Sequence, residues 1–237
     1  MKFKLLTLSF FLLAAVTLQA QGVALKTFED SASYAIGRDI FHSMTQQWQR
    51  QNLPINTEVA VQAMMDCARG NDKWDNALAQ ELLTRFQQEM ERRQKEAVQA
   101  NIDAGKKFME ANSNNKSVYT TPSGLQYRRI RSGNGKHPSM NTDIKGGKPD
   151  KVKVHYTGTL IDGKVFDSSV QRGQPITFAL DRVIPGWTEG IQLMDEGSKY
   201  MLYIPYNLAY GEHAAGDIPG GSTLIFEVEL LEINPEK

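Results

Sequence analysis

The chain has 237 residues, of which 41% are hydrophobic and 23% are charged, a composition typical of a folded globular protein with one large domain or two small ones. Lysine plus arginine and aspartate plus glutamate number 27 each, so the chain lacks the basic excess of a nucleic-acid-binding protein and the acidic excess of a solvating tail. These balances exclude nucleic acid as the expected partner.

The first residues predict export. Lys2 and Lys4 precede an apolar run at residues 5–18, and Ala20 offers a small residue for cleavage. A membrane anchor is the alternative, but a run of about 14 residues is shorter than the roughly 20 that span a bilayer. We therefore expect a signal peptide at residues 1–20 and a periplasmic mature protein, or one that is secreted or associated with the cell surface, without a stable membrane anchor.

Cys67 is the only cysteine, so no intrachain disulfide can hold the exported chain together. The domains must therefore fold on their cores alone. Cys67 follows Ala63 and Met64 at helical spacing, which predicts a small buried side chain rather than a reactive thiol.

The spacing of apolar residues predicts an all-α N-terminal domain at residues 21–74. One helix is expected at residues 28–48 and ends before Pro54. A second helix follows Asn56 or Thr57 as its N-cap and stops at Gly70.

A long connecting helix is expected at residues 75–112, because this segment has no proline and a single glycine, Gly105. Its length would be on the order of 55 Å. The second half is polar and is expected to be a largely solvated spacer, followed by a polar linker at residues 113–118. The first half carries an apolar stripe: Leu78, Leu82, Leu83, Phe86 and Met90. Two short helices offer too little surface to cover this stripe, which favours a homodimer through the N-terminal domain.

After residue 118 the texture changes to short strands separated by Gly, Pro and Asp. Five strands are predicted around one short helix at residues 186–194, which indicates an α+β domain at residues 119–237 with a curved antiparallel sheet wrapped on that helix. The predicted strands lie in residues 124–131, 150–160, 176–180, 199–205 and 222–233.

This β-rich half also contains a candidate site. Tyr156 alternates with Val152 and Val154 on the sheet face that meets the helix, so its hydroxyl needs a polar partner, for which Asp167 is the clearest candidate. Large side chains recur where loops meet strands or the helix, and together they predict a concave apolar pocket with a few polar groups at its rim. These side chains are Phe166, Phe178, Val183, Ile184, Trp187, Tyr210 and Ile218. No catalytic dyad, metal-ligand cluster or phosphate loop accompanies them, so we expect neither a metal nor a cofactor.

The segments VHYTGTLIDGKVFDSS, VIPGWTEGIQLM and LAYGEHAAGDIPGGSTLIFEVELLEI resemble the FKBP family of peptidyl-prolyl cis-trans isomerases, and the lead-in TPSGLQYRRI agrees with it. The resemblance covers residues 119–233 with the motifs in the family's order. The front half, with SYAIGRDI and INTEVAVQAMMDCARG before a long helix, is similar to the N-terminal dimerisation domain of the exported bacterial branch, which includes the macrophage infectivity potentiator proteins.

The resemblance implies roles for the pocket residues. Trp187 would form the floor, Tyr156, Phe166 and Phe226 the walls, and the backbone of Val183 and Ile184 the edge that receives the substrate. Asp167 and Tyr210 would be polar groups of the rim and, with Tyr156, the catalytic residues, while Ile218 would reach over the pocket from a loop. Three departures stand out: Ile176 replaces an aromatic residue that many members carry, the stretch at residues 179–184 is shorter than in the single-domain branch, and the turn at residues 139–149 is longer than usual.

Such a pocket needs no nucleophile, because rotation about an X-Pro bond breaks no covalent bond. The sequence therefore predicts an isomerase that assists the folding of exported proteins and binds proline-containing unfolded or extended chains. The alternatives are a dimeric holdase or binding module with little catalysis, and a structural adaptor, which would not need an intact pocket. At the level of single residues, Asp167 could be a structural turn residue and Trp187 an ordinary core residue.

Overall fold

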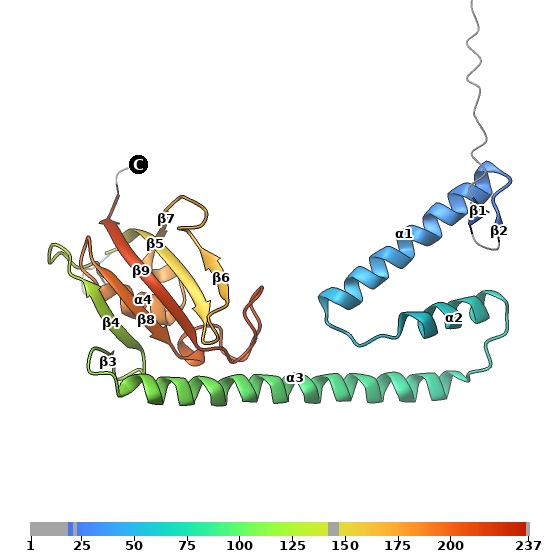
Figure 1. Ribbon diagram of the computed structural model, residues 1–237, viewed down its shortest axis with the longest axis horizontal. Helices are drawn as coiled ribbons and strands as arrows, with labels where there is room; N and C mark the ends of the chain where they lie inside the picture. The colour runs from blue at the N-terminus through green and yellow to red at the C-terminus, as the bar shows by residue number, and fades with distance from the viewer. Residues whose placement is uncertain (1–18, 21–22, 142–146, 236–237) are drawn as a thin grey trace, which may run out of the picture. The chain divides into compact units, whose positions relative to one another are not determined.

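The computed structural model describes residues 19–20, 23–141 and 147–235, so nearly all of the expected signal peptide lies outside the described residues. Contacts divide the chain into two compact units, with the division after Asn76 (Figure 1). The first unit is helical and the second contains the sheet.

Local capping explains where the helices of the first unit begin. After a minimal pair of strands, β1 (Gln19–Ala20) and β2 (Val23–Ala24), helix α1 spans Phe28–Arg50 and α2 spans Thr57–Ala68. Thr27 and Asp30 form a reciprocal capping box at the start of α1. The side chain of Asn56 accepts a hydrogen bond from the amide of Val59 at the start of α2, which confirms the predicted N-cap.

The described residues of the first unit form no closed core within one chain. In α1 and α2, both fully described, no residue is buried. Ile36 and Ile40 of α1 are 61% and 56% exposed, and Val59 of α2 is exposed as well. Cys67 is exposed, so the prediction of a buried cysteine was wrong for the single chain, because two short helices cannot surround a side chain.

Helix α3 spans Asn76–Ser113, close to the predicted bounds, and most side chains of its second half are exposed as predicted, but part of one face is docked. Ile102 and Gly105 are buried, and the ring of Phe108 lies 6.0 Å from that of Tyr203. The amide of Asn112 donates to Gln126 Oε1 at 2.8 Å. The second half of α3 is therefore largely solvated but is not a free spacer, because a few residues spaced about one turn apart are enough to dock a helix without altering its polar composition. The observed division after Asn76 therefore places α3 with the sheet, before the linker expected at residues 113–118.

Gly105 is needed where α3 touches the sheet domain, since a Cβ built there would collide with the side chain of Thr223. Gly105→Ala is expected to destabilise the second unit by about 1–2 kcal/mol, because overpacking outweighs the gain of about 0.5–1 kcal/mol in helix propensity. Urea unfolding of the full chain measures this effect. The neighbouring exposed Ala104 is the control, because Ala104→Gly should lose only the propensity term. A stabilised Gly105→Ala protein would contradict the observed docking.

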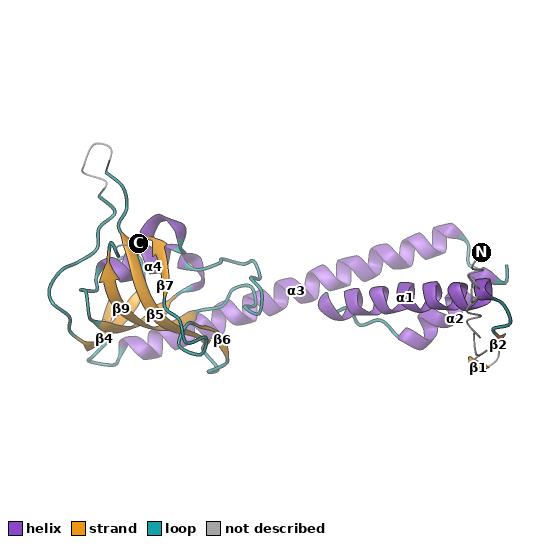
Figure 2. Ribbon diagram, turned by 90° about the horizontal axis from the view of Figure 1, so that it is seen from above, coloured by secondary structure: helices purple, strands orange, loops and turns teal. Residues whose placement is uncertain are grey.

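The second unit is built on an antiparallel sheet of seven strands in the order β3-β4-β8-β9-β5-β6, with β7 also paired to β5 (Figure 1). Figure 2 shows the strands of this sheet in orange. The α+β class is confirmed. The prediction of five strands missed β3 and β6, which have two and four residues. The strands are β3 (Tyr119–Thr120), β4 (Gln126–Arg131), β5 (Lys151–Leu160), β6 (Val165–Ser168), β7 (Ile176–Ala179), β8 (Lys199–Ile204) and β9 (Leu224–Ile233).

The core lies between one face of this sheet and helix α4 (Pro185–Gln192). Burial alternates along β5, where Val152, Val154 and Tyr156 face the core as predicted. Trp187 and Ile191 of α4 complete the core cluster. Two short 3-10 turns, η1 (Leu180–Arg182) and η2 (Tyr206–Leu208), precede α4 and the loop that leads to β9.

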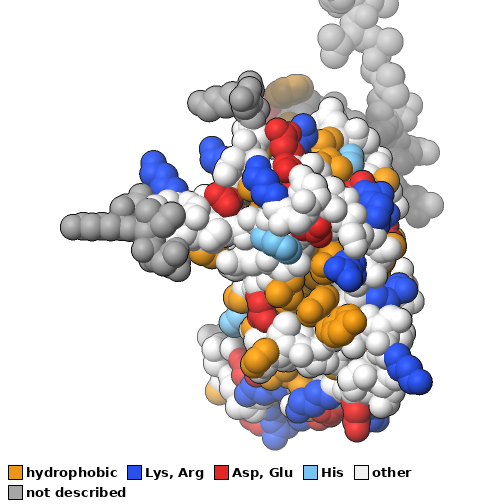
Figure 3. Space-filling view, turned by 90° about the vertical axis from the view of Figure 1, so that its left-hand side faces the viewer, with side chains coloured by type: hydrophobic (Ala, Val, Ile, Leu, Met, Phe, Trp, Pro, Cys, Tyr) orange, Lys and Arg blue, Asp and Glu red, His pale blue; other side chains and the backbone are white. Residues whose placement is uncertain are grey.

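Surface chemistry agrees with the balanced charge. On the face drawn in Figure 3, Lys and Arg side chains are intermixed with Asp and Glu. Within the described ranges, no helix is long and apolar enough to cross a membrane.

Candidate functional site

A hollow of about 520 Å³ opens between α4, β5 to β7 and the loop after η2. This volume falls in the range typical of small-ligand sites. Its lining comprises Tyr156, Phe166, Asp167, Ile176, Phe178, Arg182, Val183, Ile184, Trp187, Tyr210 and Phe226. Most of these side chains are apolar, so a ligand in the hollow would leave water for an aromatic surface.

Trp187 forms the centre of this aromatic surface. Its ring meets Phe226 edge to face with centroids 5.0 Å apart, and meets Tyr156 in the same way at 5.1 Å. Phe166 stands edge to face on Phe226 at 5.4 Å, and Phe178 lies 5.3 Å from Trp187. Edge-to-face contacts of this kind hold aromatic rings in fixed orientations. Trp187 sits in the first turn of α4, where Pro185 starts the helix.

The polar side of the pocket is a closed network of three residues. The hydroxyl of Tyr156 donates to Asp167 Oδ2, and Arg172 Nη1 donates to Asp167 Oδ1. Arg172 Nη2 also donates to the Tyr156 hydroxyl at 3.0 Å. The predicted pairing of Tyr156 with Asp167 is therefore observed. Because the Asp167–Arg172 pair is roughly half exposed, its main effect is to orient these groups rather than to stabilise the fold.

The neighbouring residue Ser169 holds the backbone of Tyr156 in place. Ser169 Oγ accepts a hydrogen bond from the amide of Tyr156 at 2.8 Å, and the amide of Ser169 donates to the Tyr156 carbonyl at 3.0 Å. Strand pairing sets Asp167 opposite Gly158. The tyrosine and the aspartate are thus fixed by the sheet as well as by their own side chains.

The network shifts both pKa values in the direction that preserves it. Partial burial raises the pKa of Asp167, but hydrogen bonds from Tyr156 and Arg172 outweigh burial and hold that pKa below its usual value. Burial, together with the Asp167 carboxylate, raises the pKa of the Tyr156 hydroxyl. At neutral pH, Asp167 is an engaged anion and Tyr156 a neutral donor, so neither is a free general base.

All of the expected site residues line the hollow except Ile218. Ile218 is 7% exposed, packs in the core cluster and is not part of the lining of the hollow. Three further residues belong to the site. Ile176 and Arg182 line the hollow, and Arg172 completes the polar network. Arg172 follows Asp167 by five residues across a turn. This spacing matches neither helix nor strand periodicity, so the sequence carries no local signal for the contact.

Among the described residues, no group of three or more His, Cys, Asp or Glu is placed to hold a metal ion.

Residues 143–231 match the family model described as FKBP-type peptidyl-prolyl cis-trans isomerase, and residues 29–128 match the domain amino terminal to FKBP-type peptidyl-prolyl isomerase. The chain is 41% identical over 216 residues to FKBP-type peptidyl-prolyl cis-trans isomerase FkpA of Aeromonas hydrophila, covering 88% of this chain and 77% of that one. The chain belongs to the FKBP-type peptidyl-prolyl cis-trans isomerases.

Two further FKBP comparisons extend over nearly the whole chain. Outer membrane protein MIP of Legionella longbeachae is 37% identical over 241 residues, covering 98% of each chain. The crystal structure of FkpA from Escherichia coli is 33% identical with a TM-score of 0.67, covering 90% of this chain and 99% of that one. Both halves of the FKBP resemblance, the isomerase domain and the domain before it, are therefore confirmed.

Proposed function

We propose that the Trp187 pocket binds X-Pro segments of extended polypeptides and accelerates their cis-trans isomerisation without covalent catalysis. The observation that carries this proposal is the engaged state of Asp167. The only carboxylate among the described residues of the pocket lining is engaged by Tyr156 and Arg172, while the rest of the lining is mostly aromatic and aliphatic. Such a site suits a reaction that needs neither a nucleophile nor a base.

Amide rotation is a reaction of this kind. Its barrier of about 18–20 kcal/mol comes from resonance, and the twisted amide has lost its charge-separated form. An apolar pocket therefore favours the twisted state over the planar one. A thousandfold acceleration requires about 4 kcal/mol, which desolvation and one or two hydrogen bonds can supply.

The pocket residues divide this work by position. Trp187 underlies the proline ring, with Phe166, Phe178 and Phe226 around it. Val183 and Ile184 have extended backbone conformations before α4, and their backbone groups receive the flanking substrate residues. Tyr210 at the rim donates a hydrogen bond to a substrate carbonyl. Asp167 fixes Tyr156 and orients the substrate.

An isomerisation assay on the full chain tests the proposal. Peptides with leucine before proline should be isomerised about tenfold faster than peptides with glutamate there, because a charged side chain would have to leave water for an apolar wall. A protein that binds the leucine peptide without accelerating isomerisation would support the holdase alternative instead.

We also propose that the chain is exported and dimeric. The support for export is the apolar run after Lys2 and Lys4. The support for a homodimer through the first unit is the exposure of Ile36, Ile40 and Val59. Clients of such a dimer would be unfolded exported proteins, for which it could also act as a chaperone. Mass spectrometry of protein from the native cell envelope tests export, and an intact Met1 would contradict it.

The pH profile of isomerisation is expected to be flat between about pH 5 and 9 and to fall below about pH 4. Because folding lowers the pKa of Asp167, the network is intact above the ordinary carboxylate pKa and is lost as the pH drops through the folded value. The raised pKa of Tyr156 keeps its hydroxyl protonated at the alkaline end of this range. NMR exchange spectroscopy on a proline peptide gives the profile.

Asp167→Asn is the control for this profile. Its residual activity should lack the acid limb, because the titrating group is gone. A bell-shaped profile centred near neutral pH would contradict the engaged carboxylate and indicate a general base.

A further inference from the structure

Tyr210 begins a loop whose two ends are tied together. The amide of Gly221 donates to the carbonyl of Gly211 at 2.9 Å, so residues 211–221 form a closed excursion directly after Tyr210. Within it, Ala215 and Ile218 form an isolated bridge, and Ile218 is anchored in the core. Tyr210 itself is 42% exposed at the pocket rim, so its position depends on the loop more than on packing of its own ring.

The far end of this loop rests on α3. Gly221 has a φ of +76°, and a Cβ added there would lie 2.6 Å from the carbonyl oxygen of Val98. The partly buried side chain of Asn101 donates from Nδ2 to the carbonyl of Gly220 at 2.9 Å. Helix and loop backbone therefore meet closely at Gly220 and Gly221, and Asn101 makes the specific hydrogen bond at that junction.

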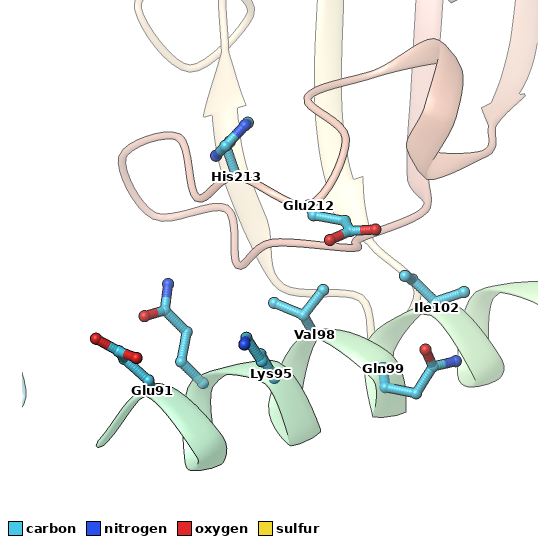
Figure 4. Close-up of a pocket in the computed structure, with 8 residues that line it drawn as sticks. Glu91, Lys95, Val98, Gln99, Ile102, Glu212 and His213 are labelled. Atoms are coloured by element: carbon cyan, nitrogen blue, oxygen red, sulfur yellow. The ribbon is translucent and has the colours of Figure 1, made fainter. Parts of the chain in front are cut away.

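The near end of the loop is open. Figure 4 shows Glu212 and His213 on the loop across from Val98 and Ile102 of α3. A hollow of about 480 Å³ lies between them, so this end of the loop does not close onto the helix. Contact with α3 is thus concentrated at Gly220 and Gly221, which the Gly221–Gly211 hydrogen bond links to Tyr210.

We propose that Asn101 is a positioning residue for the isomerase: by holding Gly220 on α3, it sets the loop that carries Tyr210 at the pocket rim. The inference rests on the proposed function of the Trp187 pocket. It makes α3 part of the isomerase module. Asn101 does not touch the substrate, and acts through Gly220, Gly221 and Gly211 on Tyr210.

The test compares two asparagines of α3 in the full chain. Asn101 and Asn112 each donate one side-chain hydrogen bond to the part of the second unit that follows α3, but Asn112 reaches Gln126 on β4, away from the loop. Asn101→Ala should lower kcat/KM on a proline peptide about fivefold, because a misplaced rim group weakens transition-state contacts. Asn112→Ala should stay within about 1.5-fold of the wild type, although both remove one hydrogen bond. Thermal unfolding of both variants checks that they remain folded.

A double-mutant cycle with Tyr210→Phe separates positioning from a merely structural role. If Asn101 acts through the Tyr210 hydroxyl, Asn101→Ala should have no further effect on kcat/KM in the Tyr210→Phe background. The same fivefold loss in both backgrounds would overturn the proposal, as would equal effects of Asn101→Ala and Asn112→Ala. If the alanine variant does not fold, Asn101→Asp takes its place in both comparisons, because aspartate keeps the shape of the side chain but loses the hydrogen-bond donor.

Asp167→Ala in the same assay distinguishes the role of Asn101 from the proposed function of the pocket. If the wild-type chain has no isomerase activity, or if Asp167→Ala leaves kcat/KM unchanged, the proposed function of the pocket is contradicted. If Asp167→Ala loses activity while Asn101→Ala keeps the wild-type kcat/KM, only the proposed role of Asn101 is contradicted.

Discussion

Asp167→Ala is expected to lower kcat/KM for proline peptides by about 10- to 30-fold, corresponding to roughly 1.4–2 kcal/mol of transition-state stabilisation. The substitution leaves the hydroxyl of the buried Tyr156 with Arg172 as its remaining partner and frees Arg172 to move. Both changes disturb the polar side of the pocket while the aromatic floor stays in place. The measurement is the isomerisation rate of the full chain at neutral pH, with circular dichroism to show that the variant is folded.

Asp162→Ala is the matched control for this variant. Asp162 lies in the turn between β5 and β6, where its carboxylate accepts a hydrogen bond from the amide of Lys164, outside the pocket lining. Its removal should change kcat/KM by less than about twofold, as is usual for surface substitutions. Equal activity of the Asp167→Ala and wild-type proteins, both folded, would show that Asp167 is only a structural turn residue.

Replacing both Ile36 and Ile40 of α1 with glutamate is expected to convert a dimer into a monomer. These side chains are more than half exposed in one chain, and a dimer would bury them. Four unpaired carboxylates in an apolar interface should weaken association by at least about a thousandfold, or roughly 4 kcal/mol. Light scattering at micromolar concentration measures the change.

The monomeric variant should separate two activities. Its rate per chain on short peptides should match the wild type, because the pocket lies within the second unit. Its acceleration of a proline-limited protein refolding reaction should fall about tenfold, because two linked sites raise the effective concentration of the second contact.

Gln47→Glu combined with Gln49→Glu provides the control for charge. These exposed positions of α1 receive the same two carboxylates without loss of apolar surface, so this variant should remain dimeric. A wild-type chain that is monomeric, or an Ile36 and Ile40 variant that is still dimeric, would contradict association through the first unit.

The sequence predicted those features of the fold that depend on residues close together in the chain. The alternation of Val152, Val154 and Tyr156 marked the buried face of β5, because successive side chains of a strand point to opposite sides. Asn56 marked the start of α2, because its side chain can cap a helix amide three residues ahead. The FKBP resemblance identified most of the pocket lining, because its residues lie in ordered motifs that can be aligned one by one.

Other features depended on contacts between distant residues. Composition made the second half of α3 look solvated, yet Ile102 and Gly105 are buried against residues more than a hundred positions later. Ile218 packs in the core cluster outside the lining of the hollow, because the surroundings of a loop side chain depend on how the loop is anchored.

From the sequence alone, the family, the α+β class, the helices α1 to α3 and the pairing of Tyr156 with Asp167 could be determined, because each rests on spacing within a short segment or on a motif. The tertiary structure alone decided that Arg172 closes the polar network and that α3 docks beside the Tyr210 loop. Those contacts depend on turns and close approaches of the backbone, which set distances between residues but leave no period in the sequence.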